Sequence, residues 1–246
     1  MFINLVSCLF VLDSEKNDNI RKNDIKKIKV LTTSDNMLPT IKFNGEDMKR
    51  EVKKELITIL GSDIFHLEQV FTMGYKDGVD IIYLGITNIE NVKNLKPGYQ
   101  LLEFKVENNS SVIYGDSSFS YQTLEIEENN SIQYIHEIKA EKNIKKLLLY
   151  LLISYKKIRS NIDISDIIFK FMGSSFTLED VRILYEMIKD TSVDKSNFRK
   201  RIIKYCEKID EKDDNKNGFR PSQKYKFKPL KGDIWLWLLQ QIIKEN

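Results

Sequence analysis

The sequence predicts an α/β (α+β) fold in which a sandwich of strands and helices precedes a smaller, mainly helical domain. Strand-like runs dominate the first half, one amphipathic helix interrupts them early, and helical periodicity begins near residue 136. A mixed sheet with helices packed against it is typical of such a sandwich. A chain of 246 residues is long enough for two modest domains, each with its own hydrophobic core.

Short apolar and β-branched runs, separated by turn residues, predict the strands of the first half. We expect strands over residues 3–12, 27–31, 67–72, 79–86, 100–106, 111–114 and 121–126. A helix is expected over residues 48–60, because Met48, Val52, Leu56 and Leu60 share one face and Gly61 follows as a stop.

The composition is that of a soluble globular protein, with 41% hydrophobic and 30% charged residues. The apolar residues 1–12 lack the basic region and cleavage site of a secretory signal and are too short to span a bilayer. Cys8 and Cys206 make neither a disulfide framework nor a zinc-binding spacing. We therefore expect a cytoplasmic protein with no membrane partner and no cofactor.

Helical spacing predicts a helix over residues 144–158 that is apolar on more than one face. Such a helix is expected to lie between domains or at a dimer interface. From Ser160 onward the sequence indicates polar helices that end in a short basic hairpin. A last helix over residues 232–246 is expected to pack in a core or dimer interface through Ile234, Trp235, Leu238, Leu239 and Ile242.

Basic residues are concentrated near the C-terminus. Residues 191–231 contain 13 Lys and Arg against 6 Asp and Glu, a net charge of +7, whereas the remainder has a net charge of −4. A basic block on a slightly acidic body indicates a polyanionic partner. A solvated lysine-rich surface explains the charge alone equally well.

A helix, a short turn and a second helix begin at Thr177. Thr177 is expected to cap the first helix, with Asp180 three residues on, and the second helix is expected to start at Asp194. Phe198, Ile202 and either Tyr205 or Cys206 would be its buried residues. This is the layout of a helix-turn-helix, whose second helix fits the major groove of DNA. The alternative is a small helical domain with a lysine-rich face.

The expected DNA contacts lie on two segments. After the polar stretch 207–217, Lys and aromatic residues alternate, which predicts the strand of a wing. A winged helix-turn-helix would use both the second helix and the wing to bind double-stranded operator DNA. The candidate contacts are Lys195, Ser196, Asn197, Arg199, Lys200, Arg220, Ser222, Gln223 and Lys224.

Residues 38–62 resemble the Nudix box, the signature of enzymes that hydrolyse nucleoside diphosphates linked to another group. Glu46, Glu55, Leu56 and Gly61 match that signature without a gap. The positions that depart from it are Thr40, Lys54, Thr58, Ile59 and Ser62. In the box several carboxylates on one helical face hold Mg²⁺. An ordinary amphipathic helix with coincidental Glu residues explains the match equally well.

The two departures at Thr58 and Ile59 fall where the box has its paired Glu. Hard Mg²⁺ prefers carboxylate oxygens, which Ile lacks and which Thr replaces only weakly. We therefore expect a Nudix-like α/β/α sandwich with no catalytic and no metal-binding residues. An active Nudix hydrolase with an accessory domain is the alternative.

Further motifs resemble the NrtR-type Nudix-related transcriptional regulators. In order and spacing, the resemblance covers residues 1–229. Its elements are Leu67-Glu68-Gln69-Val70-Phe71-Thr72, Tyr83-Leu84, Phe176-Thr177-Leu178, Leu184-Tyr185-Glu186, residues 194–200, Arg220-Pro221-Ser222 and Tyr225-Lys226-Phe227.

The resemblance implies a homodimeric repressor. A Nudix-like sensor domain (1–137) would bind a nucleotide-type effector such as ADP-ribose, through Glu46, Lys54, Glu55, Glu68 and Gln69. A connecting and dimerisation helix (138–160) and a winged helix-turn-helix (161–231) would follow, with the C-terminal helix (232–246) last. Thr40-Ile41 replaces the usual Gly-Gly of the pocket loop. A winged-helix adaptor that binds protein is the remaining alternative.

Overall fold

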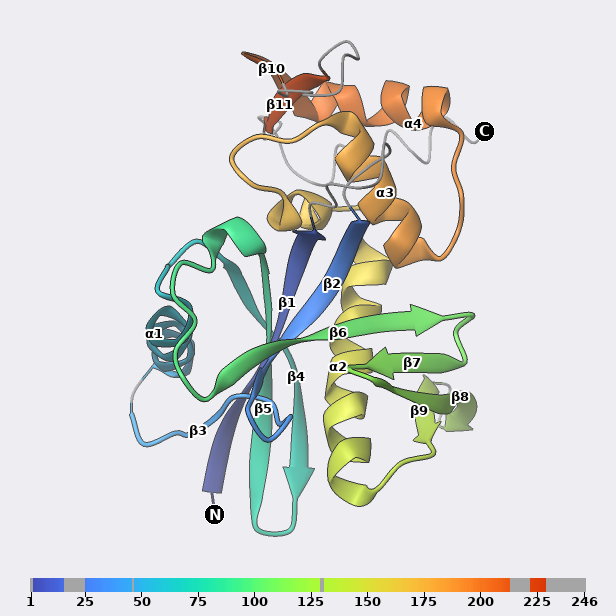
Figure 1. The fold of residues 1–246 in the computed structure, drawn as a ribbon. Helices are drawn as coiled ribbons and strands as arrows, with labels where there is room; N and C mark the ends of the chain where they lie inside the picture. The colour runs from blue at the N-terminus through green and yellow to red at the C-terminus, as the bar shows by residue number, and fades with distance from the viewer. Residues whose placement is uncertain (1, 16–24, 46, 129–130, 213–221, 229–246) are drawn as a thin grey trace. The chain divides into compact units, whose positions relative to one another are not determined.

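The computed structural model describes residues 2–15, 25–45, 47–128, 131–212 and 222–228 (Figure 1). They form two compact units. The first lies within residues 1–15 and 27–157, the second lies within residues 16–26 and 158–246, and the boundary between Lys157 and Ile158 falls within one helix. This division falls inside the segment 138–160 that was expected to connect two domains.

The first unit contains one large sheet. Its strands are β1 (Phe2–Glu15), β2 (Ile25–Thr33), β3 (Thr40–Lys42), β4 (His66–Tyr75), β5 (Gly78–Asn88), β6 (Tyr99–Glu107), β7 (Ser111–Tyr114), β8 (Ser117–Glu128) and β9 (Ser131–Ile138). Among the described residues the strand order is β4-β5-β1-β2-β6-β7-β8-β9, with β3 paired to β1. β1 and β5 are parallel, whereas β4 with β5 and β2 with β6 are antiparallel.

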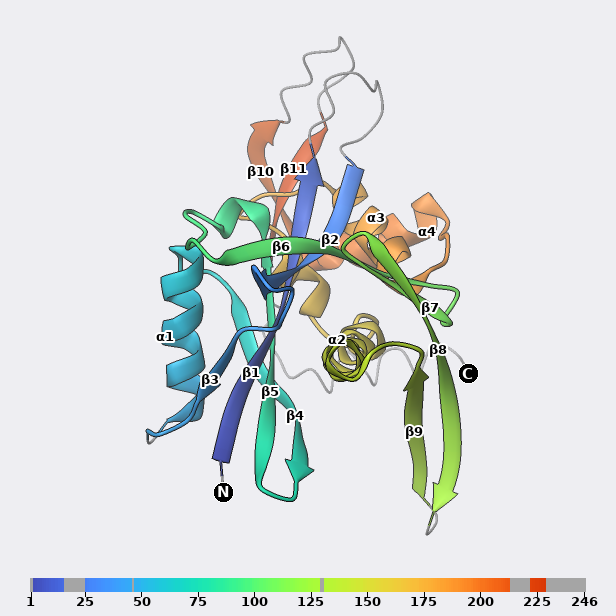
Figure 2. The same ribbon diagram turned by 60° about the horizontal axis from the view of Figure 1, so that its bottom comes forward.

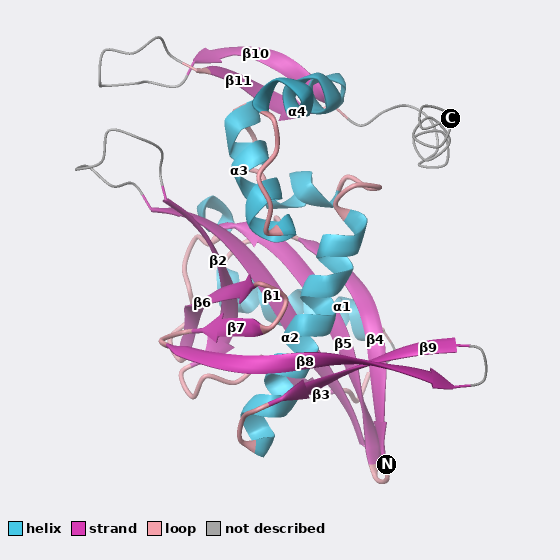
Figure 3. Ribbon diagram, turned by 90° about the vertical axis from the view of Figure 1, so that its right-hand side faces the viewer, coloured by secondary structure: helices cyan, strands magenta, loops and turns pink. Residues whose placement is uncertain are grey.

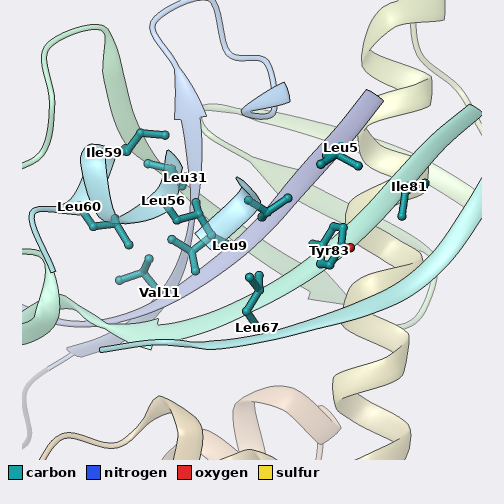
Figure 4. Close-up of a cluster of buried hydrophobic side chains, with 11 residues drawn as sticks. Leu5, Leu9, Val11, Leu31, Leu56, Ile59, Leu60, Leu67, Ile81 and Tyr83 are labelled. Atoms are coloured by element: carbon teal, nitrogen blue, oxygen red, sulfur yellow. The ribbon is translucent and has the colours of Figure 1, made fainter. Parts of the chain in front are cut away.

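Helix α1 (Met48–Leu60) covers one face of this sheet. Asp47 caps it by accepting the N–H of Arg50 at 2.9 Å, and Gly61 ends it in the left-handed conformation, with φ of 67°. Side chains alternate along a strand, so Leu5 and Leu9 of β1 both point toward α1. Figure 4 shows them packed with Leu56 and Leu60 in a fully buried cluster.

Helix α2 (Lys142–Asn161) packs on the opposite face. The even-numbered side chains of β1 point toward it, and the rings of Phe10 and Tyr155 lie 6.3 Å apart. Figure 2 shows that the sheet curls around α2, with β4 and β5 on one side and β8 and β9 on the other. The first unit is therefore an α/β/α sandwich, and the predicted fold class is confirmed.

A buried carboxylate joins α2 to the sheet. Asp80 on β5 is 1% exposed and accepts hydrogen bonds from Asn4 at 2.9 Å and from the hydroxyl of Tyr150 at 2.8 Å. Lys146 forms an ion pair with it at 2.7 Å and lies 4.6 Å from the centre of the Tyr75 ring. Burial opposes ionisation of Asp80, but these hydrogen bonds and the Lys146 charge outweigh it and lower the pKa of Asp80.

The second unit contains helices and a hairpin (Figure 3). Its elements are the 3-10 helix η2 (Ile167–Phe171), α3 (Leu178–Lys189), α4 (Lys195–Ile202), the 3-10 helix η3 (Ile203–Tyr205), β10 (Cys206–Lys212) and β11 (Gln223–Phe227). β10 and β11 pair antiparallel, and Phe169 of η2 stacks on Phe227 at 4.4 Å. Phe176 pairs with Tyr225, which attaches the hairpin to the segment before α3.

Several sequence-based predictions were incomplete. The strands β3, β9 and β10 were missed. β3 has only three residues, and β10 is charged and lacks an apolar alternation. The expectation of polar helices from Ser160 onward was wrong for η2, whose residues Ile167, Ile168, Phe169 and Phe171 are buried. The predicted helix 232–246 lies outside the described residues. Among the helices of the described chain, none has the length and apolar character needed to cross a membrane.

The apolar character of α2 has an explanation inside the chain. Leu147, Leu148, Leu151 and Leu152 are at most 4% exposed, because the curled sheet surrounds much of the helix. Burial within the chain therefore explains why α2 is apolar on more than one face, and a dimer interface on this helix is not needed for that explanation.

Candidate nucleic-acid interface

The first helix of the predicted helix-turn-helix begins with a capping box. The Thr177 hydroxyl accepts the N–H of Asp180 at 3.1 Å, and the Asp180 carboxylate accepts the N–H of Thr177 at 2.8 Å. These reciprocal bonds satisfy two donors at the start of α3. They confirm the predicted cap, and Val181, Leu184, Tyr185 and Ile188 form the buried face as expected.

Helix α4 packs against α3 through aromatic side chains. Tyr185 and Phe198 lie 5.3 Å apart between ring centres, and the Arg201 guanidinium lies 5.0 Å from the Tyr185 ring. Asp194 caps α4 by accepting the N–H of Asn197 at 2.8 Å. With Phe198 and Ile202 buried, the opposite side of α4 is left to solvent.

The exposed side of α4 carries all five candidate contacts of this helix. Lys195, Ser196, Asn197, Arg199 and Lys200 are each exposed. Two of them, Asn197 and Arg199, have the paired donors or acceptors that can read base edges, whereas the lysines suit phosphates.

A hollow of about 240 Å³ lies beside α4, and we call it the winged-helix hollow. Its walls include Glu179 and Arg182 of α3, Lys195 and Arg199 of α4, and Ser222 and Gln223 at the start of β11. The structure thus brings candidate contacts from the recognition helix and from the wing into one depression.

The candidate residues of the wing differ in the exposure and hydrogen bonding of their side chains. Ser222 is exposed, but the Gln223 amide donates to the carbonyl oxygens of Ile209 at 2.6 Å and Lys224 at 3.0 Å. Lys224 is half-buried. Arg220 lies outside the described residues. Ser222 is therefore the most accessible of the wing candidates that the structure describes.

A network of charged side chains on α3 supports the turn before α4. Arg182 donates to Glu179 at 2.7 and 3.1 Å and to Glu186 at 2.5 Å. Glu186 also accepts the backbone N–H of Val193 at 2.9 Å. This network was not predicted, although the i, i+3 and i+4 spacing of its residues on a predicted helix is visible in the sequence.

Glu179 has a second cationic partner. Its carboxylate lies 3.2 Å from the ammonium of Lys195, the first residue of α4. The hydrogen bonds from Arg182 lower the pKa of Glu179 against the opposing effect of burial, and Lys195 acts in the same direction. Glu179 is therefore a charged carboxylate in a depression whose other charged side chains are basic.

The candidate effector residues of the first unit do not converge on one point. Glu55 is half-buried and accepts a hydrogen bond from the Tyr99 hydroxyl at 3.4 Å, while Lys54 is exposed. Glu68 and Gln69 are consecutive in the regular part of β4, so their side chains point to opposite faces of the sheet. Glu46 lies outside the described residues.

The positions of the paired Glu in the Nudix box do not fit a metal site. Ile59 is completely buried in the cluster between α1 and the sheet. Thr58 is exposed, and its hydroxyl donates to the carbonyl oxygen of Lys54 at 3.0 Å. Neither side chain offers the carboxylate that Mg²⁺ needs there. Within the described residues, no group of three or more His, Cys, Asp or Glu is placed to hold a metal ion.

Comparison with known families settles the nature of the second unit. Residues 168–227 match the model of the NrtR DNA-binding winged helix domain. This segment is an NrtR-type winged helix domain. The matched segment contains α3, α4 and the β10–β11 hairpin, so these elements correspond to a DNA-binding winged helix domain. No curated protein matches the chain significantly.

Solved structures match the fold over both units. The chain is similar to Shewanella oneidensis NrtR complexed with a 27mer DNA, with a TM-score of 0.63 and 13% identity, covering 92% of this chain and 94% of that one. Shewanella oneidensis NrtR in a second structure gives 0.62 and 14%, covering 93% and 95%. A MutT/nudix family protein from Enterococcus faecalis gives 0.63 and 16%, covering 93% and 88%. The predicted resemblance to NrtR-type Nudix-related regulators is confirmed.

Proposed function

We propose that this chain is a ligand-responsive transcriptional repressor that binds operator DNA through its NrtR-type winged helix. The observation that carries the proposal is the exposed face of α4, where Asn197, Arg199 and Lys200 project from a helix fixed on α3. Such a helix fits the major groove, with Asn and Arg reading bases and Lys contacting phosphates.

The Nudix-like unit is proposed to sense a nucleotide-type small molecule, such as ADP-ribose, without hydrolysing it. The loss of catalysis is supported by Ile59, which packs in the core where the box has a carboxylate. Glu55 and Lys54 on α1, with Gln69 on β4, are the described residues we propose as effector contacts. In this scheme residues 1–137 sense, 138–160 connect and 161–231 bind DNA.

A homodimer is part of the proposal, because a two-fold dimer suits a palindromic operator. The mass in solution at micromolar protein concentration, measured by light scattering, tests this. A monomeric mass would remove the dimer from the scheme.

Nudix hydrolysis is the second candidate function, favoured by the similarity to the Enterococcus faecalis protein. Incubation of the protein with ADP-ribose and Mg²⁺ decides between the two. Release of a nucleoside monophosphate at an ordinary enzymatic rate favours the hydrolase.

The main test selects duplexes from a random pool and then titrates the selected and a random duplex at several salt concentrations. We expect tighter binding of the selected duplex, a linear fall of log K with log salt, and a change on adding ADP-ribose. If the double substitution Arg199→Ala/Arg220→Ala leaves duplex binding unchanged, the winged helix binds another partner and the protein-binding adaptor is the better interpretation.

A further inference from the structure

Glu179 is an acidic residue among the groups expected to meet DNA. It lines the winged-helix hollow together with Lys195, Arg199 and Ser222. A group that binds these three side chains within the hollow therefore also lies near the Glu179 carboxylate. The hydrogen bonds from Arg182 hold this carboxylate in place.

Lys195 is held by this carboxylate in the absence of DNA. Its ammonium lies 3.2 Å from Glu179, although its side chain is 75% exposed and free to move. An exposed pair of this kind is weak in water, so the lysine can exchange one anion for another. A phosphate must displace Glu179 from Lys195. A Lys195–phosphate contact therefore contributes less to the free energy of DNA binding than a contact from an unpaired lysine.

We propose that Glu179 lowers the affinity of the winged helix for the DNA backbone by competing with phosphate for Lys195. This inference rests on the proposed DNA-binding function and adds a residue that sets its strength. The partner is the phosphate backbone of duplex DNA, so the effect is independent of base sequence. Glu179 thereby reduces binding to random duplex, which lacks the base contacts of an operator.

The substitution Glu179→Gln tests this with little change in shape, since the amide oxygen keeps one of the two hydrogen bonds from Arg182. Each additional neutralised phosphate adds about 0.9 to the slope of log K against log salt. We therefore expect about fivefold tighter binding to random duplex near 0.15 M salt, and a slope steeper by about one. In a Lys195→Gln background, Glu179→Gln should bring no gain.

Asp166→Asn is the matched control. Asp166 pairs with Lys170 at 2.8 Å in the same unit, but it lies on neither α3, α4 nor the wing. Its substitution removes one negative charge and frees one lysine, as Glu179→Gln does. DNA affinity should stay within about twofold, because Asp166 contacts none of the described candidate DNA-binding residues and its charge is screened by salt. Thermal unfolding verifies that each variant is folded.

A second comparison does not require Glu179→Gln to fold. Lys195→Gln should lower the salt slope by much less than Lys200→Gln, because the Lys195 charge is already paired. Three outcomes overturn the inference. The first is a folded Glu179→Gln protein that binds random duplex no more tightly than the wild type, and the second is an equal gain in affinity for Asp166→Asn. The third is an equal fall in the salt slope for Lys195→Gln and Lys200→Gln. Absence of salt-dependent duplex binding by the wild type overturns the proposed function itself, and this inference with it.

Discussion

The carboxylate of Glu186 accepts the backbone N–H of Val193 at 2.9 Å while it also holds the guanidinium of Arg182. One side chain on α3 thus stabilises the turn that leads into α4. The position of the recognition helix therefore depends on a residue that is not itself on the exposed face of that helix.

Glu186→Ala should destabilise the protein by about 1–3 kcal/mol, because the N–H of Val193 and one side of Arg182 lose their acceptor. Urea unfolding measures the change in free energy. Glu186→Gln is the control, since its amide oxygen still accepts the N–H, and it should recover much of the stability. Equal losses in both variants would show that charge, and not the hydrogen bond to the turn, is what matters.

Ile59→Glu should unfold or strongly destabilise the first unit, by several kcal/mol, because it places an unpaired carboxylate in a completely buried position. Thr58→Glu should be tolerated, because Thr58 is exposed. Circular dichroism during thermal unfolding compares the two. We further expect no hydrolysis of ADP-ribose by wild type or by Thr58→Glu, and a folded, active Ile59→Glu variant would contradict this account.

Asn197→Ala and Arg199→Ala should relax sequence preference and cost about 1–3 kcal/mol if each makes a bidentate base contact. Lys200→Ala should weaken binding to all duplexes alike and lower the salt slope by about one. Titrations against a selected and a random duplex separate these classes. A uniform effect of Asn197→Ala on both duplexes would assign that residue to the backbone.

Asp80→Asn should cost about 1–3 kcal/mol at neutral pH, because it removes the charge that pairs with Lys146 and replaces one of the two accepting carboxylate oxygens with an NH2 donor. The pKa of Asp80 is lowered in the folded state, so its ionised form contributes stability above the unfolded pKa. That contribution is lost as the pH falls through the folded pKa. Unfolding measured from neutral to acidic pH should therefore show the difference between variant and wild type shrinking. A constant difference would mean that the Asp80 charge is not involved.

Local patterns predicted the α-helices of the described residues well. The apolar stripe of α1, the Thr177 cap of α3 and the start of α4 at Asp194 are all visible in the sequence, because they depend on residues a few positions apart. The strand β10 was not visible, since it carries the charged sequence Cys206-Glu207-Lys208-Ile209-Asp210-Glu211-Lys212 and is defined by its pairing with β11.

The candidate site was predicted only where it depends on one helix. The exposed residues of α4 follow directly from its buried positions, Phe198 and Ile202. The place of Glu179 beside Lys195 depends on how α3 and α4 cross, which no local pattern encodes. Likewise, the sequence pair Glu68-Gln69 looked like one contact region, but strand alternation separates its two side chains.

The burial of Ile59 has a consequence for the history of this sequence. Natural proteins stand only slightly above the stability needed to stay folded, so a buried carboxylate at this position would remove much of that margin. A full Nudix box in this chain would need compensating changes in the neighbouring leucines before the carboxylate could be accepted. Substitutions on the exposed side of the first unit are therefore far more accessible to this chain than a carboxylate at position 59.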